Sequence, residues 1–160
     1  MLTVKLICVG KMREKYYMEA FAEYSKRLSG YCRFECQEIP EQRLPDSPSA
    51  SEIAAALEKE GAEILKAVPE GAWLTALCVE GKSLSSEDVA RLIASRADSG
   101  RPKLCFVIGG SFGLSPAVKT QADLRMSMSA MTFPHHLARV MLAEQIYRGF
   151  KINEGSRYHK

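Results

Sequence analysis

Three glycines lie within five residues, directly after the apolar segment 103–108: Gly109, Gly110 and Gly113. Glycine-rich turns after strands often bind the phosphates of nucleotides or dinucleotides. The spacing here is G-G-x-x-G instead of G-x-G-x-x-G, and the turn follows the fourth strand-like segment of the chain instead of the first. A P-loop would need a lysine where Leu114 stands. Both kinds of phosphate site are therefore disfavoured.

With both phosphate-binding motifs disfavoured, the glycine turn could still contact a flat ligand through its main-chain groups. Adjacent glycines leave N–H and C=O groups approachable. The segment 127–136, SMSAMTFPHH, adds small residues and methionine surface. Together the two segments suit an adenine that is bound by main-chain hydrogen bonds and packed by apolar side chains. The alternatives stay open: a strand-to-helix turn that needs a positive φ, and ordinary core for 127–136.

Four polar side chains near the C-terminus could bind a substrate or accept its proton: His135, Arg148, Tyr158 and His159. Each also has an ordinary structural alternative. Arg148 follows Glu144 by four residues, the spacing of a surface ion pair on a helix. His135 comes at the start of a helix, and the last residues of a chain are often disordered.

The cysteines and histidines do not indicate a metal site or a disulfide framework. Cys8, Cys78 and Cys105 lie in apolar segments, where reduced cysteine behaves as a small core residue. No C-x-x-C pair exists, and the three histidines have no acidic cluster around them. We expect no bound metal.

The positive charge is concentrated in residues 11–33 and 135–160, although the whole chain carries only +3. Such segments could contact nucleic-acid phosphates, or they could be the solvated faces of two helices. No apolar run approaches the ~20 residues of a membrane span. The N-terminal segment lacks the features of a signal peptide, so the sequence favours a cytoplasmic protein.

Strand and helix patterns alternate along the chain. Strand-like segments are 2–9, 32–39, 73–80 and 103–108, with a short strand or irregular segment at 125–133. Helical segments are 13–28, 51–67, 86–98, a short one at 116–123, and 135–152. The expected N-terminal caps are Ser49 or Ser51, Ser85 with Asp88, and Ser115 before Pro116. Gly81 and Lys82 are expected to turn the chain after the third strand.

This order favours a single α/β domain over residues 1–160, with a mostly parallel sheet of about five strands flanked by helices. Ligands of such sheets bind beyond the carboxyl ends of the strands. The loops expected there are 10–13, 40–49, 80–85, 109–115 and 126–134.

Four segments together make the sequence similar to a known family: LTALCVEGKSLSSEDVA, FVIGGSFGLSP, SMSAMTFPHHLARVMLAEQIYRGFKI and the terminal YHK. It resembles the RlmH family, the ribosomal large-subunit pseudouridine N3-methyltransferases of the SPOUT class. The resemblance extends from Lys5 to Lys160 and is most specific over 106–160. It departs from the usual family pattern at Phe112 and at Ser156-Arg157. It implies an α/β fold whose C-terminal segment forms a trefoil knot, a rare exception to ordinary chain topology.

The resemblance also implies a methyl donor and the residues that hold it. The donor is S-adenosylmethionine, and no metal takes part. The implied donor-binding residues lie in the loop after the third strand, the glycine turn and the segment before the last helix. They are Leu77, Gly109, Gly110, Met128, Ser129, Ala130, Met131, Thr132 and Phe133.

The implied acceptor is N3 of pseudouridine 1915 in 23S rRNA of the assembled 70S ribosome. The implied partners are this RNA and a second copy of the chain, with no DNA and no membrane. Because N3 must lose a proton, a base or a cation that stabilises the imide anion would help. The implied catalytic residues are His159, Tyr158 and Arg148, and the implied substrate contacts are His135, Arg157 and Lys160.

Two alternative functions and one hypothesis about the dimer remain open at this stage. The chain could methylate another RNA, such as tRNA, or it could be a non-catalytic ribosome-binding factor. Within a methyltransferase homodimer, the tail of one subunit could complete the donor site of the other.

Overall fold

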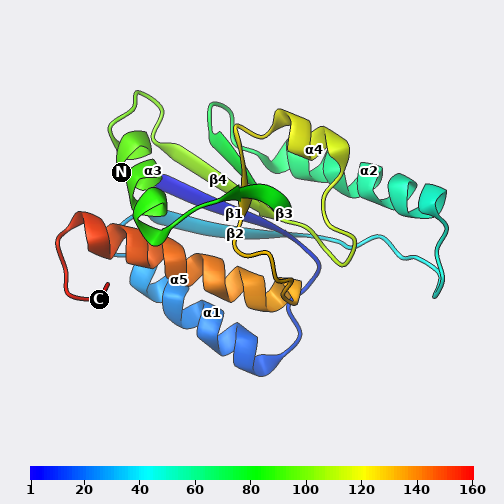
Figure 1. Ribbon diagram of the computed structural model, residues 1–160, viewed down its shortest axis with the longest axis horizontal. Coiled ribbons are helices and arrows are strands. Elements are labelled where there is room, and N and C mark those ends of the chain that lie inside the picture. The colour runs from blue at the N-terminus through cyan, green and yellow to red at the C-terminus, as the bar shows by residue number, and fades with distance from the viewer.

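The computed structural model describes residues 1–160, in which five strands alternate with five helices (Figure 1). The strands are β1 Thr3–Val9, β2 Arg33–Ile39, β3 Trp73–Ser83, β4 Lys103–Ile108 and β5 Leu124–Ser127. The helices are α1 Lys15–Leu28, α2 Ala50–Ala67, α3 Ser86–Ala97, α4 Pro116–Gln121 and α5 His135–Asn153. No helix combines the length and the apolar character needed to cross a membrane.

The strands form one sheet in the order β2-β1-β4-β3-β5, and every neighbouring pair is parallel. This confirms the α/β fold with a five-stranded parallel sheet. Because all strands run the same way, their carboxyl ends meet at one edge of the sheet. The predicted ligand loops therefore converge at that edge.

Helices cover both faces of the sheet, as parallel strands require. Helices α1, α3 and α5 lie on one face, and α2 and α4 lie on the other (Figure 1). Neighbouring residues of β1 point to opposite sides, so that Leu6 packs toward α5 and Ile7 toward α2, both fully buried. The apolar strands thus form two cores, one on each face.

The predicted helix caps are confirmed. Ser49 and Ser85 each form a capping box with the residue three positions on, Glu52 and Asp88. Ser115 caps α4 through the N–H of Val118, and proline occupies the first helical position. The starts of α2, α3 and α4 are therefore encoded locally.

The predicted turn at Gly81 and Lys82 is wrong, because β3 continues to Ser83. After its register with β5 shifts, β3 pairs with it again at Lys82 and Ser83. At Gly81 the two backbones approach so closely that a Cβ atom would lie 2.8 Å from the main chain of Arg125. Glycine is needed at this position because only a residue without a side chain allows this close approach. Between the two paired parts of β3, residues 78–81 have no ladder partner on β5.

Arg139 ties helix α5 to the carboxyl ends of β1 and β2. Its guanidinium, 3% exposed, donates to Glu38 Oε2 at 2.7 Å and to the carbonyl of Gly10 at 3.0 Å. Burial raises the pKa of Glu38, but hydrogen bonds from Arg139 and from the N–H of Met12 outweigh it and leave the pKa below its ordinary value. The contact fixes the start of α5 against the sheet edge.

We expect Arg139→Met to lower the free energy of unfolding by about 2 kcal/mol at neutral pH, because it removes charged hydrogen bonds from a partly exposed carboxylate. Urea denaturation measures this change. Ionised Glu38 stabilises the fold fully at pH values above the pKa that it has in the unfolded chain. This contribution is lost as the pH falls through the lower pKa that it has in the folded protein. The difference between variant and wild type should therefore shrink in acid. An effect no larger than that of Arg91→Met, at a mostly exposed side chain, would contradict this account.

Candidate active site

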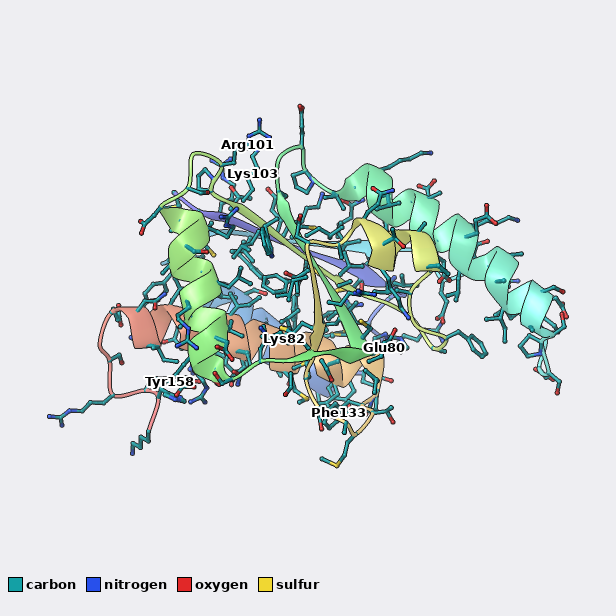
Figure 2. All side chains as sticks on the ribbon, turned by 45° about the horizontal axis from the view of Figure 1, so that its top comes forward. Glu80, Lys82, Arg101, Lys103, Phe133 and Tyr158 are labelled. Atoms are coloured by element: carbon teal, nitrogen blue, oxygen red, sulfur yellow. The ribbon has the colours of Figure 1, made fainter.

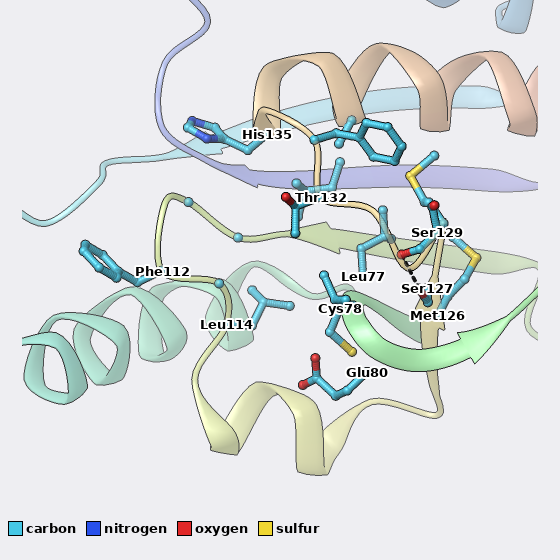
Figure 3. Close-up of a pocket in the computed structure, with 18 of the residues that line it drawn as sticks. Leu77, Cys78, Glu80, Phe112, Leu114, Met126, Ser127, Ser129, Thr132 and His135 are labelled. Carbon is cyan, nitrogen blue, oxygen red and sulfur yellow. Dashed lines mark hydrogen bonds between the residues drawn. The ribbon is translucent and has the colours of Figure 1, made fainter. Parts of the chain in front are cut away.

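A cavity of about 420 Å³ opens at the carboxyl ends of β3, β4 and β5 (Figure 3). Three separate segments line it: 77–80, 108–114 and 126–133. Eight of the nine residues expected to bind the donor lie on its wall; Ala130 does not line it. The eight are Leu77, Gly109, Gly110, Met128, Ser129, Met131, Thr132 and Phe133.

We call this cavity the donor cavity, after the residues expected there. Its β3 wall is the part of the strand that leaves the β5 ladder. Leu77, Cys78, Val79 and Glu80 all line the cavity. Lys119 of α4 pairs with the Glu80 carboxylate, and this hydrogen bond holds the pKa of Glu80 below its ordinary value. Because Cys78, Val79 and Glu80 have no ladder partner on β5, their main chain is available to a ligand.

The glycine turn forms the second wall, and its glycines have structural causes within the chain. Gly113 has a φ of +83° and donates its N–H to the carbonyl of Gly110 at 3.1 Å. A Cβ on Gly109 would lie 2.3 Å from the Gly113 carbonyl oxygen. A Cβ on Gly110 would lie 2.8 Å from Glu41 Oε1. The turn thus needs glycine at 109 and 113 for its own shape, whereas the close contact at Gly110 is with the end of a flexible side chain.

The segment after β5 forms the third wall and is held by local hydrogen bonds. Ser127 Oγ donates to the carbonyl of Ser129 at 3.0 Å (Figure 3), and Ser129 Oγ accepts from the N–H of Met131, also at 3.0 Å. Met131 nevertheless exposes 68% of its surface, and Phe112 exposes 49% across the rim. Large exposed apolar side chains around a cavity are typical of a ligand or partner site.

The sequence-predicted catalytic residues form a second cluster, between the end of α5 and the tail. Arg148 binds Glu144 Oε1 through Nε at 2.9 Å and through a terminal nitrogen at 2.6 Å, which raises the pKa of the guanidinium. Tyr158 donates to the same oxygen at 3.3 Å, and its ring lies 4.9 Å from the Arg148 guanidinium. Burial and the negative charge of Glu144 raise the pKa of Tyr158 to about 12, so it remains a hydrogen-bond donor at neutral pH.

His159 completes this tail cluster. Arg148 donates to His159 Nδ1 at 3.1 Å, and a guanidinium has no lone pair with which to accept. The ring proton therefore lies on Nε2, which donates to Glu87 Oε1 at 2.8 Å and lowers the pKa of that carboxyl. The tail is thus docked against α3 and α5. Its two other predicted site residues, Arg157 and Lys160, are exposed.

No residue of the tail cluster lines the donor cavity of the same chain. His135, at the start of α5, lines the cavity, whereas Arg148 lies roughly 20 Å further along the helix at 1.5 Å per residue. Figure 2 shows Phe133 and Tyr158 on well-separated parts of the molecule. Among the predicted catalytic and substrate residues, only His135 lines the cavity.

A polar cavity of about 430 Å³, which the sequence did not predict, lies beside the first one. Its wall includes Glu14, Glu41 and His136, and it shares His135 with the donor cavity. The loops that form it, 10–13 and 40–49, were expected at this edge of the sheet. Their individual side chains gave no pattern, because residues from three distant segments meet only after folding. The chain has no group of three or more His, Cys, Asp or Glu side chains placed to hold a metal ion.

The chain is similar to proteins of one known family. The family model described as "Predicted SPOUT methyltransferase" matches residues 2–159. Two relatives named "Ribosomal RNA large subunit methyltransferase H", from Clostridium novyi (strain NT) and Clostridioides difficile (strain 630), are 46% and 43% identical. Each alignment covers 99% of this chain and 100% of the relative.

Two solved structures share the fold. The probable methyltransferase from Bordetella pertussis Tohama I is 17% identical, with a TM-score of 0.58 over 91% of this chain and 93% of that chain. The probable methylase family protein from Haemophilus influenzae Rd KW20 is 11% identical, with a TM-score of 0.55 over 98% of this chain and 70% of that chain. With its whole length matched by the family model and by the curated relatives, the chain belongs to the SPOUT methyltransferases, in the group named ribosomal RNA large subunit methyltransferase H.

Proposed function

We propose that the protein methylates large-subunit ribosomal RNA, with S-adenosylmethionine as the donor and N3 of pseudouridine 1915 in 23S rRNA as the acceptor. The observation that carries this proposal is the donor cavity: three segments of a SPOUT chain, distant in sequence, form one cavity from eight of the nine expected residues. The relatives' names support large-subunit rRNA as the substrate class.

The residues of the donor cavity fit S-adenosylmethionine. A volume of about 420 Å³ lies within the usual range of ligand pockets, roughly 300–1,000 Å³. Apolar surface from Leu77, Leu114 and Met128 suits an adenine ring, and the turn at Gly109 and Gly110 brings main-chain groups to the wall without side chains. When bound, the sulfonium supplies an electrophilic methyl group and a neutral thioether leaving group.

The protein must align N3 with the methyl group and accept its proton. In the overall reaction the N3–H bond and the S–CH₃ bond break, an N3–CH₃ bond forms, and the proton passes to a base. His135 lines the donor cavity, and burial lowers its pKa, which favours a neutral ring with a free lone pair. Arg148, with a raised pKa, supplies a permanent positive charge for the imide anion.

The separation of the two clusters supports a homodimer with composite active sites. We propose that the tail of one subunit, with Tyr158 and His159, approaches the donor cavity of the other. The exposed Arg157 and Lys160 would then lie near the RNA. Methylation should also fall steeply with salt, because basic side chains that neutralise phosphates release counterions.

The RNA class is tested by mass spectrometry of RNA from a strain that lacks the gene. We expect loss of one N3-methyl mark from 23S rRNA and an unchanged tRNA profile. Loss of a tRNA mark with intact 23S rRNA would favour a different substrate.

Calorimetry separates the enzyme from the alternative of a non-catalytic ribosome-binding factor. We expect the purified protein to bind S-adenosylmethionine, and a factor that only binds ribosomes has no reason to do so. Ribosome binding without any affinity for the donor would favour that alternative.

A further inference from the structure

The polar cavity beside the donor cavity has a floor of bare backbone. Gly10 forms this floor at the end of β1; its φ is +94°. Its N–H donates to the carbonyl of Ile39 at 2.8 Å, and its own carbonyl accepts from Arg139 at 3.0 Å. A Cβ at this position would lie 3.5 Å from His135 Nε2 and 3.6 Å from Glu41 Oε2. Main chain without a side chain of its own therefore lies directly beneath several converging polar atoms.

Two of these atoms, Glu41 Oε2 and His136 Nε2, have no hydrogen-bond partner in the chain. Glu41 uses Oε1 to accept from the N–H and the hydroxyl of Ser111, at 3.3 and 3.2 Å, while Oε2 has no such partner. His136 Nδ1 lies 3.0 Å from Glu14 Oε2, which can only accept, so the ring carries a proton on Nδ1. The other ring nitrogen, Nε2, is buried without a hydrogen bond. The cavity thus offers a solvent-exposed carboxylate oxygen and a buried, unpartnered ring nitrogen to the polar groups of a ligand.

The surroundings of the cavity suit a nucleotide. Lys11 and Arg13 are exposed at its rim, where they can contact phosphates. The ring of Tyr17 lines the wall and offers a surface on which a base can stack. The shared residue His135 places this cavity directly beside the donor cavity.

We propose that the polar cavity receives the acceptor base and that Glu41 Oε2 accepts the N1–H of pseudouridine. This inference rests on the proposed function. Pseudouridine is joined to its ribose through carbon, so its N1 carries a hydrogen; in uridine N1 forms the glycosidic bond and a C5–H group takes the corresponding place. Uridine would place a C–H group against the Glu41 carboxylate, where no hydrogen bond can form. A site built to bind an N–H group discriminates strongly against an analogue that lacks it.

The test compares two ribosome substrates. One comes from a strain that lacks this gene, and the other from a strain that also lacks the synthase for the target pseudouridine, so that uridine stands there. We expect the wild type to favour pseudouridine by about 1,000-fold or more in kcat/KM. Glu41→Gln should lower kcat/KM for pseudouridine by about 10- to 100-fold, leave the rate on uridine nearly unchanged, and so reduce the ratio.

Two controls isolate the carboxylate. Ser111→Ala removes the hydroxyl that binds Glu41 Oε1 and should keep the pseudouridine-to-uridine ratio, which excludes an effect through the glycine turn. Glu63→Gln, at an exposed ion pair on α2, should change nothing. If Glu41→Gln keeps the wild-type ratio, the assignment of Glu41 is wrong. If the wild type methylates neither substrate while it binds the donor, the proposed function itself fails.

Discussion

Gly109→Val is expected to raise the Kd for S-adenosylmethionine at least about 100-fold, a loss of about 2.7 kcal/mol of binding free energy. The Cβ of any side chain at 109 would lie 2.3 Å from the Gly113 carbonyl oxygen and 2.5 Å from its carbonyl carbon. This clash involves backbone, so the turn must open. The second wall of the donor cavity would then be displaced, while the two cores keep their contacts. Calorimetric titration with the donor measures the effect.

A matched control is available at Gly100, where a Cβ would meet no atom within 4 Å. Gly100→Val should bind the donor as the wild type does, and both variants should show the wild-type circular dichroism spectrum. Normal donor binding by a folded Gly109→Val protein would mean that the glycine turn is not part of the donor site.

The second large effect concerns the tail. His159→Ala should lower kcat by about 100-fold and leave the Kd for the donor within about twofold, because the substitution changes none of the residues that line the donor cavity. The variant also removes the acceptor that Arg148 uses at Nδ1. A heterodimer shows whether the tail acts on its own subunit or on its partner.

We expect activity in a heterodimer that carries Gly109→Val in one subunit and His159→Ala in the other. If tails act in trans, one donor cavity remains intact and receives an intact tail, which gives about half the wild-type rate per dimer. The reciprocal heterodimer, with both substitutions in one subunit and a wild-type partner, should be inactive. The opposite pattern, with the first heterodimer inactive and the second active, would show that each tail serves its own subunit.

The sequence predicted most of the local structure of this chain because the deciding signals are local. The caps at Ser49, Ser85 and Ser115 depend on side chains within three residues of each helix start. The parallel sheet followed from alternating apolar strands and amphipathic helices. The continuation of β3 past Gly81 was not predicted. Glycine is required there because the backbone of β5, more than 40 residues later in the chain, lies too close for a side chain.

The residues of the donor cavity could be predicted from the family resemblance. The contacts between residues far apart in the sequence could not be predicted. The donor-cavity residues occur in contiguous segments that the resemblance identifies. By contrast, the pairing of Glu41 with Ser111 joins residues 70 positions apart, and that of Glu14 with His136 joins residues 122 apart. No spacing in the sequence reveals such contacts. The trefoil knot and the roles of individual residues remain predictions.

The central claim is that this cavity serves methyl transfer to large-subunit rRNA. Its most direct test is incubation of the purified protein with methyl-labelled S-adenosylmethionine and 70S ribosomes from a strain that lacks the gene. The account predicts label in 23S rRNA, as N3-methylpseudouridine at position 1915, with wild-type protein and none with Gly109→Val. Absence of label from 23S rRNA, with folded wild-type protein and intact ribosomes, would contradict it.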